Sequence, residues 1–127
     1  MVCDDSTSVR DSLKNMLENI KKDKFNLNYY EAINGLDCLV QLYIQKTKFD
    51  LLLIDENMPF LKGSAVVNLL REIRKDKFQT EMKIVSISGD NNEDFIKYLK
   101  KQGFDHVLSK DIKKRDLEDQ IQILLSK

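Results

Sequence analysis

The sequence lacks the features that define several large protein classes. Two cysteines, Cys3 and Cys38, form no CxxC pair, and with a single histidine they cannot supply the ligands of a zinc finger. Lys plus Arg and Asp plus Glu are balanced at 21 each, so no net charge favours nucleic acid or an anionic membrane. No apolar stretch approaches the roughly 18 residues that span a bilayer. No signal peptide is visible, because Asp4 and Asp5 interrupt the start.

The composition is typical of one globular domain. The chain has 127 residues, 42% hydrophobic and 33% charged, without repeats or low-complexity linkers. We therefore expect a single domain over residues 1–127, with both cysteines reduced and packed as small hydrophobes in a cytoplasmic, intracellular protein. The apolar start, Met1–Cys3, is shorter than a usual strand of about five or six residues. We expect the chain to begin inside a strand that is truncated at its N-terminus.

Strand-like and helix-like segments alternate along the chain. Apolar runs predict five strands: Met1–Cys3, Leu27–Ile33, Phe49–Asp55, Met82–Ser88 and Phe104–Ser109. Apolar residues at helical spacing predict five helices: Ser6 to about Lys22, Leu36–Ile44, Gly63–Ile73, Phe95 to about Gly103, and Leu117–Leu125. This alternation indicates a three-layer, doubly wound α/β fold with a parallel sheet and helices on both faces. Right-handed crossovers place the carboxyl ends of all strands on one rim.

The most informative stretch is Phe49–Phe60, which reads FDLLLIDENMPF. Its uninterrupted apolar run, Leu51–Ile54, suits a strand that is buried on both faces. Asp55 follows at the point where that strand emerges. Ligand sites in open α/β sheets lie at the carboxyl ends of strands, so Asp55 is a candidate site residue.

Other polar residues follow the remaining predicted strands and should meet Asp55 at the rim. They are Asp4 and Asp5 after the first strand, Ser88 after the fourth and Lys110 after the fifth. Clustered carboxylates repel one another, and a hard cation such as Mg²⁺, with Mn²⁺ as an alternative, would relieve that repulsion. An aspartate can act as a nucleophile, and phosphoryl transfer mainly requires positioning and charge neutralisation. Ser88 and Lys110 could each contact a phosphoryl oxygen.

Each of these residues also has an ordinary structural explanation. Asp4 and Asp5 could favour a helix N-terminus through its macrodipole. Lys110 could be an exposed lysine, and Ser88 could belong to a turn. The joint pattern outweighs these separate explanations, because every member falls at a predicted strand end.

The sequence resembles the receiver domain of two-component response regulators, including receivers attached to hybrid histidine kinases. The resemblance covers essentially the whole chain and rests on these segments: Cys3–Ser6, Leu51–Pro59, Gly63, Ser86–Gly89 and Leu108–Lys110. It implies a flavodoxin-like sheet with strand order 2-1-3-4-5. It also implies that Asp55 accepts phosphate from a phosphohistidine on a histidine kinase or a histidine phosphotransfer domain. Neither nucleic-acid binding by this domain nor membrane insertion is expected.

The resemblance also assigns roles around Asp55. Asp5, Asp55 and the backbone carbonyl of Asn57 would ligate Mg²⁺, whereas Asp4 would act mainly through water. Ser88 matches the family's Thr or Ser, and Lys110 matches its lysine.

Further positions match residues that tune the family's response. Asn57 and Asp90 fall where the family adjusts the lifetime of the phosphorylated state. Val107 stands where many receivers carry a Tyr or Phe that swings inward, and a valine has no ring that could report activation by this rotation. His106, next to it, is interpreted as a surface residue on the opposite face of the strand. Asp111 replaces a common cis-proline, and we expect a trans Lys110–Asp111 bond and an altered loop, because a cis bond without proline costs about 3 kcal/mol.

Two other functions stay open. One is an interaction module that keeps the fold without switching, which Val107 and Asp111 motivate. The other is a Mg²⁺-dependent phosphohydrolase that uses Asp55 as its nucleophile; Asn57 argues against it, because such enzymes often carry a second acid at that position. We do not expect a stand-alone turnover enzyme. The domain would be either a separate receiver or a piece of a hybrid kinase, and the start inside a strand favours the piece.

Overall fold

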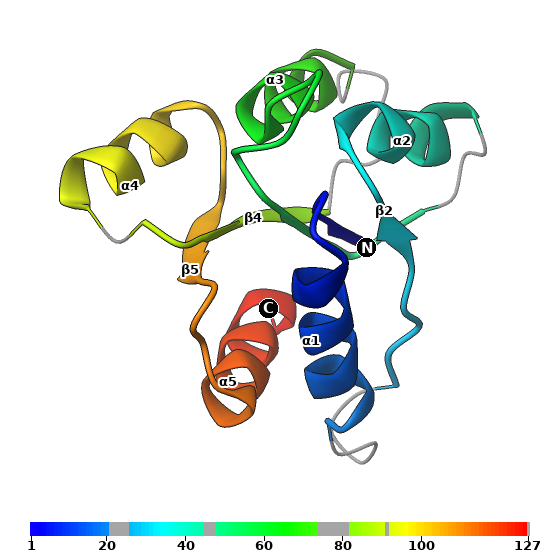
Figure 1. Ribbon diagram of the computed structural model, residues 1–127, viewed down its shortest axis with the longest axis vertical. Coiled ribbons are helices and arrows are strands. Elements are labelled where there is room, and N and C mark those ends of the chain that lie inside the picture. Colours follow the sequence, from blue (N-terminus) through cyan, green and yellow to red (C-terminus); the bar gives the residue numbers. More distant parts are fainter. Residues whose placement is uncertain (21–25, 45–47, 74–81, 91, 127) are drawn as a thin grey trace.

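Helices and strands alternate in the computed structural model, which describes residues 1–20, 26–44, 48–73, 82–90 and 92–126 (Figure 1). The strands are β1 Val2–Cys3, β2 Glu31–Ala32, β3 Leu51–Ile54, β4 Lys83–Ser88 and β5 His106–Ser109. The helices are α1 Thr7–Glu18, α2 Gly35–Leu39, α3 Gly63–Ile73, α4 Glu93–Lys101 and α5 Lys114–Leu125, and α2 continues as a π-helical turn, η1 Val40–Ile44.

The five strands form one parallel sheet in the order β2-β1-β3-β4-β5, which confirms the predicted topology. Helices α1 and α5 cover one face, and α2, α3 and α4 cover the other (Figure 1). Each face has its own hydrophobic core, and neighbouring residues of β3 alternate between them: Leu52 and Ile54 face α2–α4, whereas Leu53 faces α1 and α5. Burial on both faces explains why this strand has no polar residue.

The second predicted strand, Leu27–Ile33, is too long. Only Glu31 and Ala32 pair with a neighbouring strand, because β1 offers only Val2 and Cys3 as partners. Because β2 lies at the edge of the sheet, beside β1, its ladder within the described residues reaches no further than β1 does. For the third and fifth strands the predicted bounds were also too wide, whereas the fourth strand differs from its prediction by one residue.

The sequence pattern predicts α3 at both ends and α5 at its end, Leu125, but α4 and α5 begin two and three residues earlier than predicted. Ser6 caps α1 by accepting from the backbone N–H of Val9 at 3.4 Å, and Asn92 caps α4. The predicted end of the first helix near Lys22 lies outside the described residues; α1 itself ends at Glu18. Gly103 follows α4 with a φ of 111°, a conformation that glycine adopts without steric cost.

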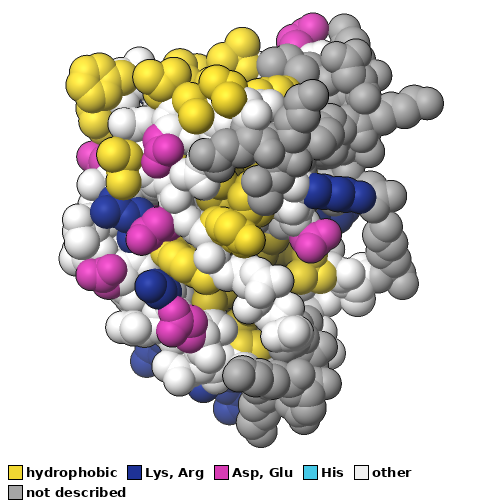
Figure 2. All heavy atoms as spheres, turned by 90° about the vertical axis from the view of Figure 1, so that its right-hand side faces the viewer, with side chains coloured by type: hydrophobic (Ala, Val, Ile, Leu, Met, Phe, Trp, Pro, Cys, Tyr) yellow, Lys and Arg dark blue, Asp and Glu magenta, His cyan; other side chains and the backbone are white. Residues whose placement is uncertain are grey.

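The face on the β2 and α2 side carries hydrophobic side chains toward its top, the direction in which α2 and α3 lie (Figure 2). Exposed hydrophobic residues of the chain include Ile33, Leu36 and Phe60. Phe60, in the loop between β3 and α3, has a left-handed φ of 69° and a side chain that is 93% exposed. Among the described helices, none is long and apolar enough to cross a membrane. Cys3 and Cys38 are free and buried.

Candidate functional site

Three carboxylates meet at the carboxyl end of the sheet, as the sequence predicts. One oxygen from each of Asp4, Asp5 and Asp55 lies within 4.8 Å of the others. Asp4 and Asp55 are only 2% and 5% exposed, whereas Asp5 is exposed. Asp4 and Asp5 lie between β1 and α1, and Asp55 directly follows β3. Parallel pairing of β1 with β3 brings these two loops together.

Among the described residues, Lys110 forms ion pairs with two of these carboxylates. Its Nζ lies 3.2 Å from Asp4 Oδ2 and 3.2 Å from Asp55 Oδ2. Burial raises the pKa of Asp55, and the charge of Asp4 raises that pKa further, against the opposing effect of Lys110. Burial alone would lower the pKa of Lys110, but Asp55 and Asp4 together raise it above its ordinary value. The lysine therefore stays charged between the two acids.

The donor set fits a hard divalent cation. Three carboxylates face one ammonium group, which leaves negative charge uncompensated among these four side chains. Asp4 Oδ2 is buried and receives no hydrogen bond from the described part of the chain, so its contact with Lys110 is an ion pair only. Oxygen donors of this kind, with water and phosphate oxygens, are those that Mg²⁺ prefers. Asn57 adds a backbone hydrogen bond to the Asp55 carboxylate.

Ser88 and Lys110 form the other side of the site. The backbone N–H of Lys110 donates to the carbonyl oxygen of Ser88 at 2.8 Å. The Ser88 hydroxyl is buried and engaged with the backbone of Asp90, whose N–H donates to it at 3.0 Å. The side chains of Asn57 and Asp90 are exposed.

The residues around β5 show where the chain departs from the expected pattern. No described peptide bond is cis, so the Lys110–Asp111 bond is trans as predicted. Asp111 is exposed, and its backbone N–H donates to Ser109 Oγ at 3.1 Å. Val107 is half-buried and packs against the core under α2–α4. His106 is half-buried rather than fully exposed.

Sequence reasoning missed Glu56, the residue after Asp55. Its side chain is only 3% exposed and accepts hydrogen bonds from the backbone N–H and the hydroxyl of Ser64, at 2.6 and 2.9 Å. A sequence clue was present: Lys62, which precedes α3, has no side-chain acceptor for the first N–H groups of that helix.

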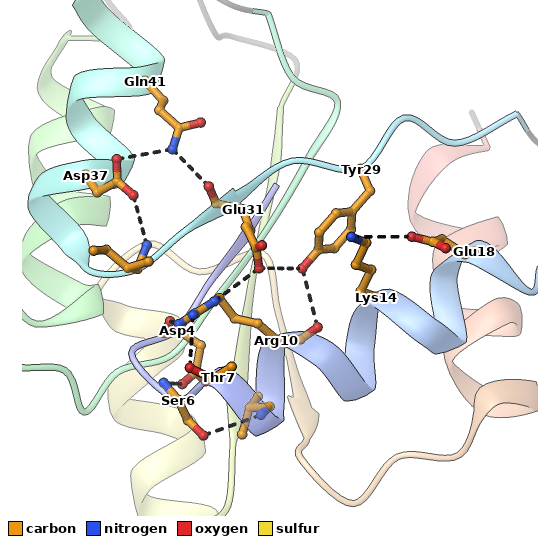
Figure 3. Close-up of polar contacts among 12 residues, drawn as sticks. Asp4, Ser6, Thr7, Arg10, Lys14, Glu18, Tyr29, Glu31, Asp37 and Gln41 are labelled. Carbon is orange, nitrogen blue, oxygen red and sulfur yellow. Dashed lines mark hydrogen bonds and ion pairs between the residues drawn. The ribbon is translucent and has the colours of Figure 1, made fainter.

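Sequence reasoning also missed Arg10 of α1, which fixes the loop that carries Asp4 (Figure 3). Its Nη1 donates to the carbonyl oxygen of Asp4 at 2.7 Å, and its Nε pairs with Glu31 of β2 at 3.1 Å. The Tyr29 hydroxyl lies within hydrogen-bonding distance of both the Glu31 carboxylate and the carbonyl oxygen of Arg10. Because Glu31 lies on another element, helical spacing alone gave no indication of this network.

Comparison with known proteins agrees with this geometry. The family model for the response regulator receiver domain matches residues 1–122. No curated protein sequence matches the chain.

Several solved structures share the fold. The signal receiver domain of a response regulator from Mycobacterium tuberculosis, NarL, is 20% identical, with a TM-score of 0.79 over 98% of this chain and 92% of that one. Chemotaxis protein CheY4 of Vibrio cholerae is 22% identical, with a TM-score of 0.77 over 98% and 95% of the two chains. The receiver domain of Francisella response regulator 1452 is 23% identical, with a TM-score of 0.77 over 98% and 93%. These similarities establish the fold, and the match to the family model shows that the chain is a member of that family. The chain therefore belongs to the response regulator receiver domains of two-component systems.

Proposed function

We propose that the chain is a phosphoacceptor receiver, in which Asp55 takes a phosphoryl group from a phosphohistidine of a histidine kinase or a histidine phosphotransfer domain. The observation that carries the proposal is the buried contact of Lys110 with both Asp4 and Asp55. Two buried acids that share one lysine contribute little to the stability of the fold, because burial disfavours the charged form of Asp55 and raises its pKa. The same arrangement suits a reaction that brings more negative charge to Asp55.

In the proposed step, an oxygen of the Asp55 carboxylate forms a bond to phosphorus, and the bond from phosphorus to the imidazole nitrogen of the donor breaks. The donor histidine leaves with that electron pair and takes up a proton. The Lys110 ammonium group pairs with a phosphoryl oxygen, and the Ser88 hydroxyl donates to another. To do so, this hydroxyl turns from the Asp90 carbonyl oxygen, 3.2 Å away.

Mg²⁺, or Mn²⁺ in its place, would be held by Asp5, Asp55 and the carbonyl oxygen of Asn57, with Asp4 acting through water. When bound, such an ion neutralises the charge that gathers on the phosphoryl oxygens. The rest of the chemistry belongs to the side chains: Asp55 attacks, and Lys110 offsets charge that would otherwise repel the incoming group. Asn57 and Asp90, which are exposed beside the site, are then placed to influence how water reaches the phosphorylated Asp55.

The test uses acetyl phosphate, a small donor that needs no protein partner. With Mg²⁺, the chain should gain one phosphate that is stable in acid and labile in base, as measured by intact mass spectrometry. Asp55→Asn should abolish this labelling, and a chelator should do the same to the unaltered chain. Equal labelling of the Asp55→Asn protein would show that another residue carries the phosphate and would contradict the assignment of Asp55.

A further inference from the structure

Glu56 lies next to Asp55 in the sequence but takes no part in the acid cluster. Both of its carboxylate oxygens are engaged by Ser64: Oε1 accepts from the backbone N–H at 2.6 Å, and Oε2 accepts from the hydroxyl at 2.9 Å. The side chain is buried, and a charged residue is seldom buried without partners of this kind. Its oxygens are therefore committed to α3 and are not offered to a ligand at the rim.

These contacts satisfy the start of α3. The first N–H groups of a helix have no partner inside the helix, and an oxygen of a preceding side chain commonly accepts from one of them. Lys62, at the position before α3, carries no acceptor. Glu56 accepts in its place, through its carboxylate from Ser64 and through its carbonyl oxygen from the N–H of Gly63 at 3.1 Å. The negative charge also suits the positive end of the helix dipole.

The same residue closes the turn that carries Asn57. The backbone N–H of Met58 donates to the carbonyl oxygen of Glu56 at 3.2 Å, which makes Asn57 the centre of a three-residue turn. At the far end of the loop, Gly63 packs so tightly on Asp55 that a Cβ there would overlap the Asp55 carbonyl oxygen. Glu56 therefore anchors both ends of the loop that follows Asp55.

We infer that Glu56 is a positioning residue of the phosphoacceptor site. By tying the segment after β3 to the first turn of α3, it fixes the direction of the Asn57 carbonyl and the Asp55 carboxylate toward the divalent cation. This inference rests on the proposed function of Asp55. The contact between Glu56 and Ser64 then contributes to Mg²⁺ affinity as well as to the stability of the fold.

The test measures Mg²⁺ binding by isothermal titration calorimetry, together with the rate of labelling by acetyl phosphate. Glu56→Ala should weaken Mg²⁺ binding about tenfold, the scale on which loss of residues that orient metal ligands acts. Glu56→Asp keeps the charge but is one methylene too short to reach Ser64, so it should also lose affinity. Glu56→Gln keeps an acceptor for the Ser64 N–H and can donate to the Ser64 hydroxyl. The Mg²⁺ affinity of Glu56→Gln should therefore lie within about twofold of that of the unaltered chain if the contact with Ser64, rather than the charge of Glu56, positions the site.

A matched control separates positioning from general loss of stability. Ile121 is fully buried in α5 on the opposite face of the sheet, so Ile121→Ala should lower the urea midpoint without changing Mg²⁺ affinity. Unaltered Mg²⁺ binding by Glu56→Ala and Glu56→Asp, measured where both are folded, would overturn the inference about Glu56 and leave the proposed function standing. An unaltered chain that neither binds Mg²⁺ nor labels would overturn both.

Discussion

The two sides of the candidate site are held in different ways. On the side of Asp4 and Asp55, one local bond, from the backbone N–H of Ser6 to Asp4 Oδ1, is joined by contacts that reach other elements or across the loop: Arg10 to the Asp4 carbonyl, Glu56 to Ser64, and Gly63 against Asp55. On the side of Ser88 and Lys110, the described side-chain hydrogen bonds join residues two apart: Ser88 with Asp90, Asp90 with Asn92, and Ser109 with Asp111.

This difference separates a fixed side from an adaptable one. A contact between distant elements can be lost only if packed elements move, whereas a turn closed over two residues can rearrange with little effect on the core. The acids are therefore preorganised, and the Ser88 hydroxyl is the group free to adjust to a bound phosphoryl group, whereas Lys110 is already held by Asp4 and Asp55.

The largest expected effect comes from matching glycines on the two sides. Gly63→Ala would place a Cβ against backbone atoms of Asp55 and Glu56 and should lower the free energy of unfolding by about 3 kcal/mol. Gly89→Ala is its control on the adaptable side, where nothing lies within 4 Å of the added Cβ, and its effect should be within about 1 kcal/mol of zero. Urea unfolding measures both. Equal losses at the two positions would remove the distinction between the sides.

A smaller effect should follow from removing the contacts of Arg10. Arg10→Ala would lose the bonds to the Asp4 carbonyl and to Glu31 and should destabilise the chain by about 1 kcal/mol. Lys14→Ala, on the same helix, removes an exposed 3.9 Å pair with Glu18 and a cation–π contact 5.5 Å from the centre of the Tyr29 ring, and it should cost less, about 0.5 kcal/mol. Thermal and urea unfolding at low and high salt compare the two variants. A larger loss at Lys14 would contradict a special role for Arg10.

The smallest expected effect concerns the charge of Asp55 in protein kept free of metal. The raised pKa of Asp55 means that the fold favours its neutral form. That contribution to stability is fully present below the ordinary value of 3.8 and is lost as the pH rises through the raised pKa. At pH 7 the charged group therefore disfavours folding, so Asp55→Asn should raise the urea midpoint there. The gain should shrink as the pH falls toward 3.8; a lower midpoint at pH 7 would contradict this reading of the site.

The fold and the meeting of the acids could be predicted from the sequence because both depend on topology. Once strands and helices alternate, parallel strands bring Asp4, Asp5 and Asp55 to one rim whatever their distance along the chain. The length of β2 could not be predicted, since its partner β1 determines it. The burial of Glu56 was not predicted, because Lys62 shows only that α3 lacks a cap of its own, whereas the choice of Glu56 as the replacement depends on how the loop returns to Ser64.

Phe60 is a suitable position for a fluorescent probe of the candidate site. Its side chain is almost fully exposed, and it lies in the same short loop as Asn57. The chain contains no tryptophan. Phe60→Trp would therefore introduce a single indole that disturbs no core contact and stands beside the candidate site, where its fluorescence would report on that loop alone.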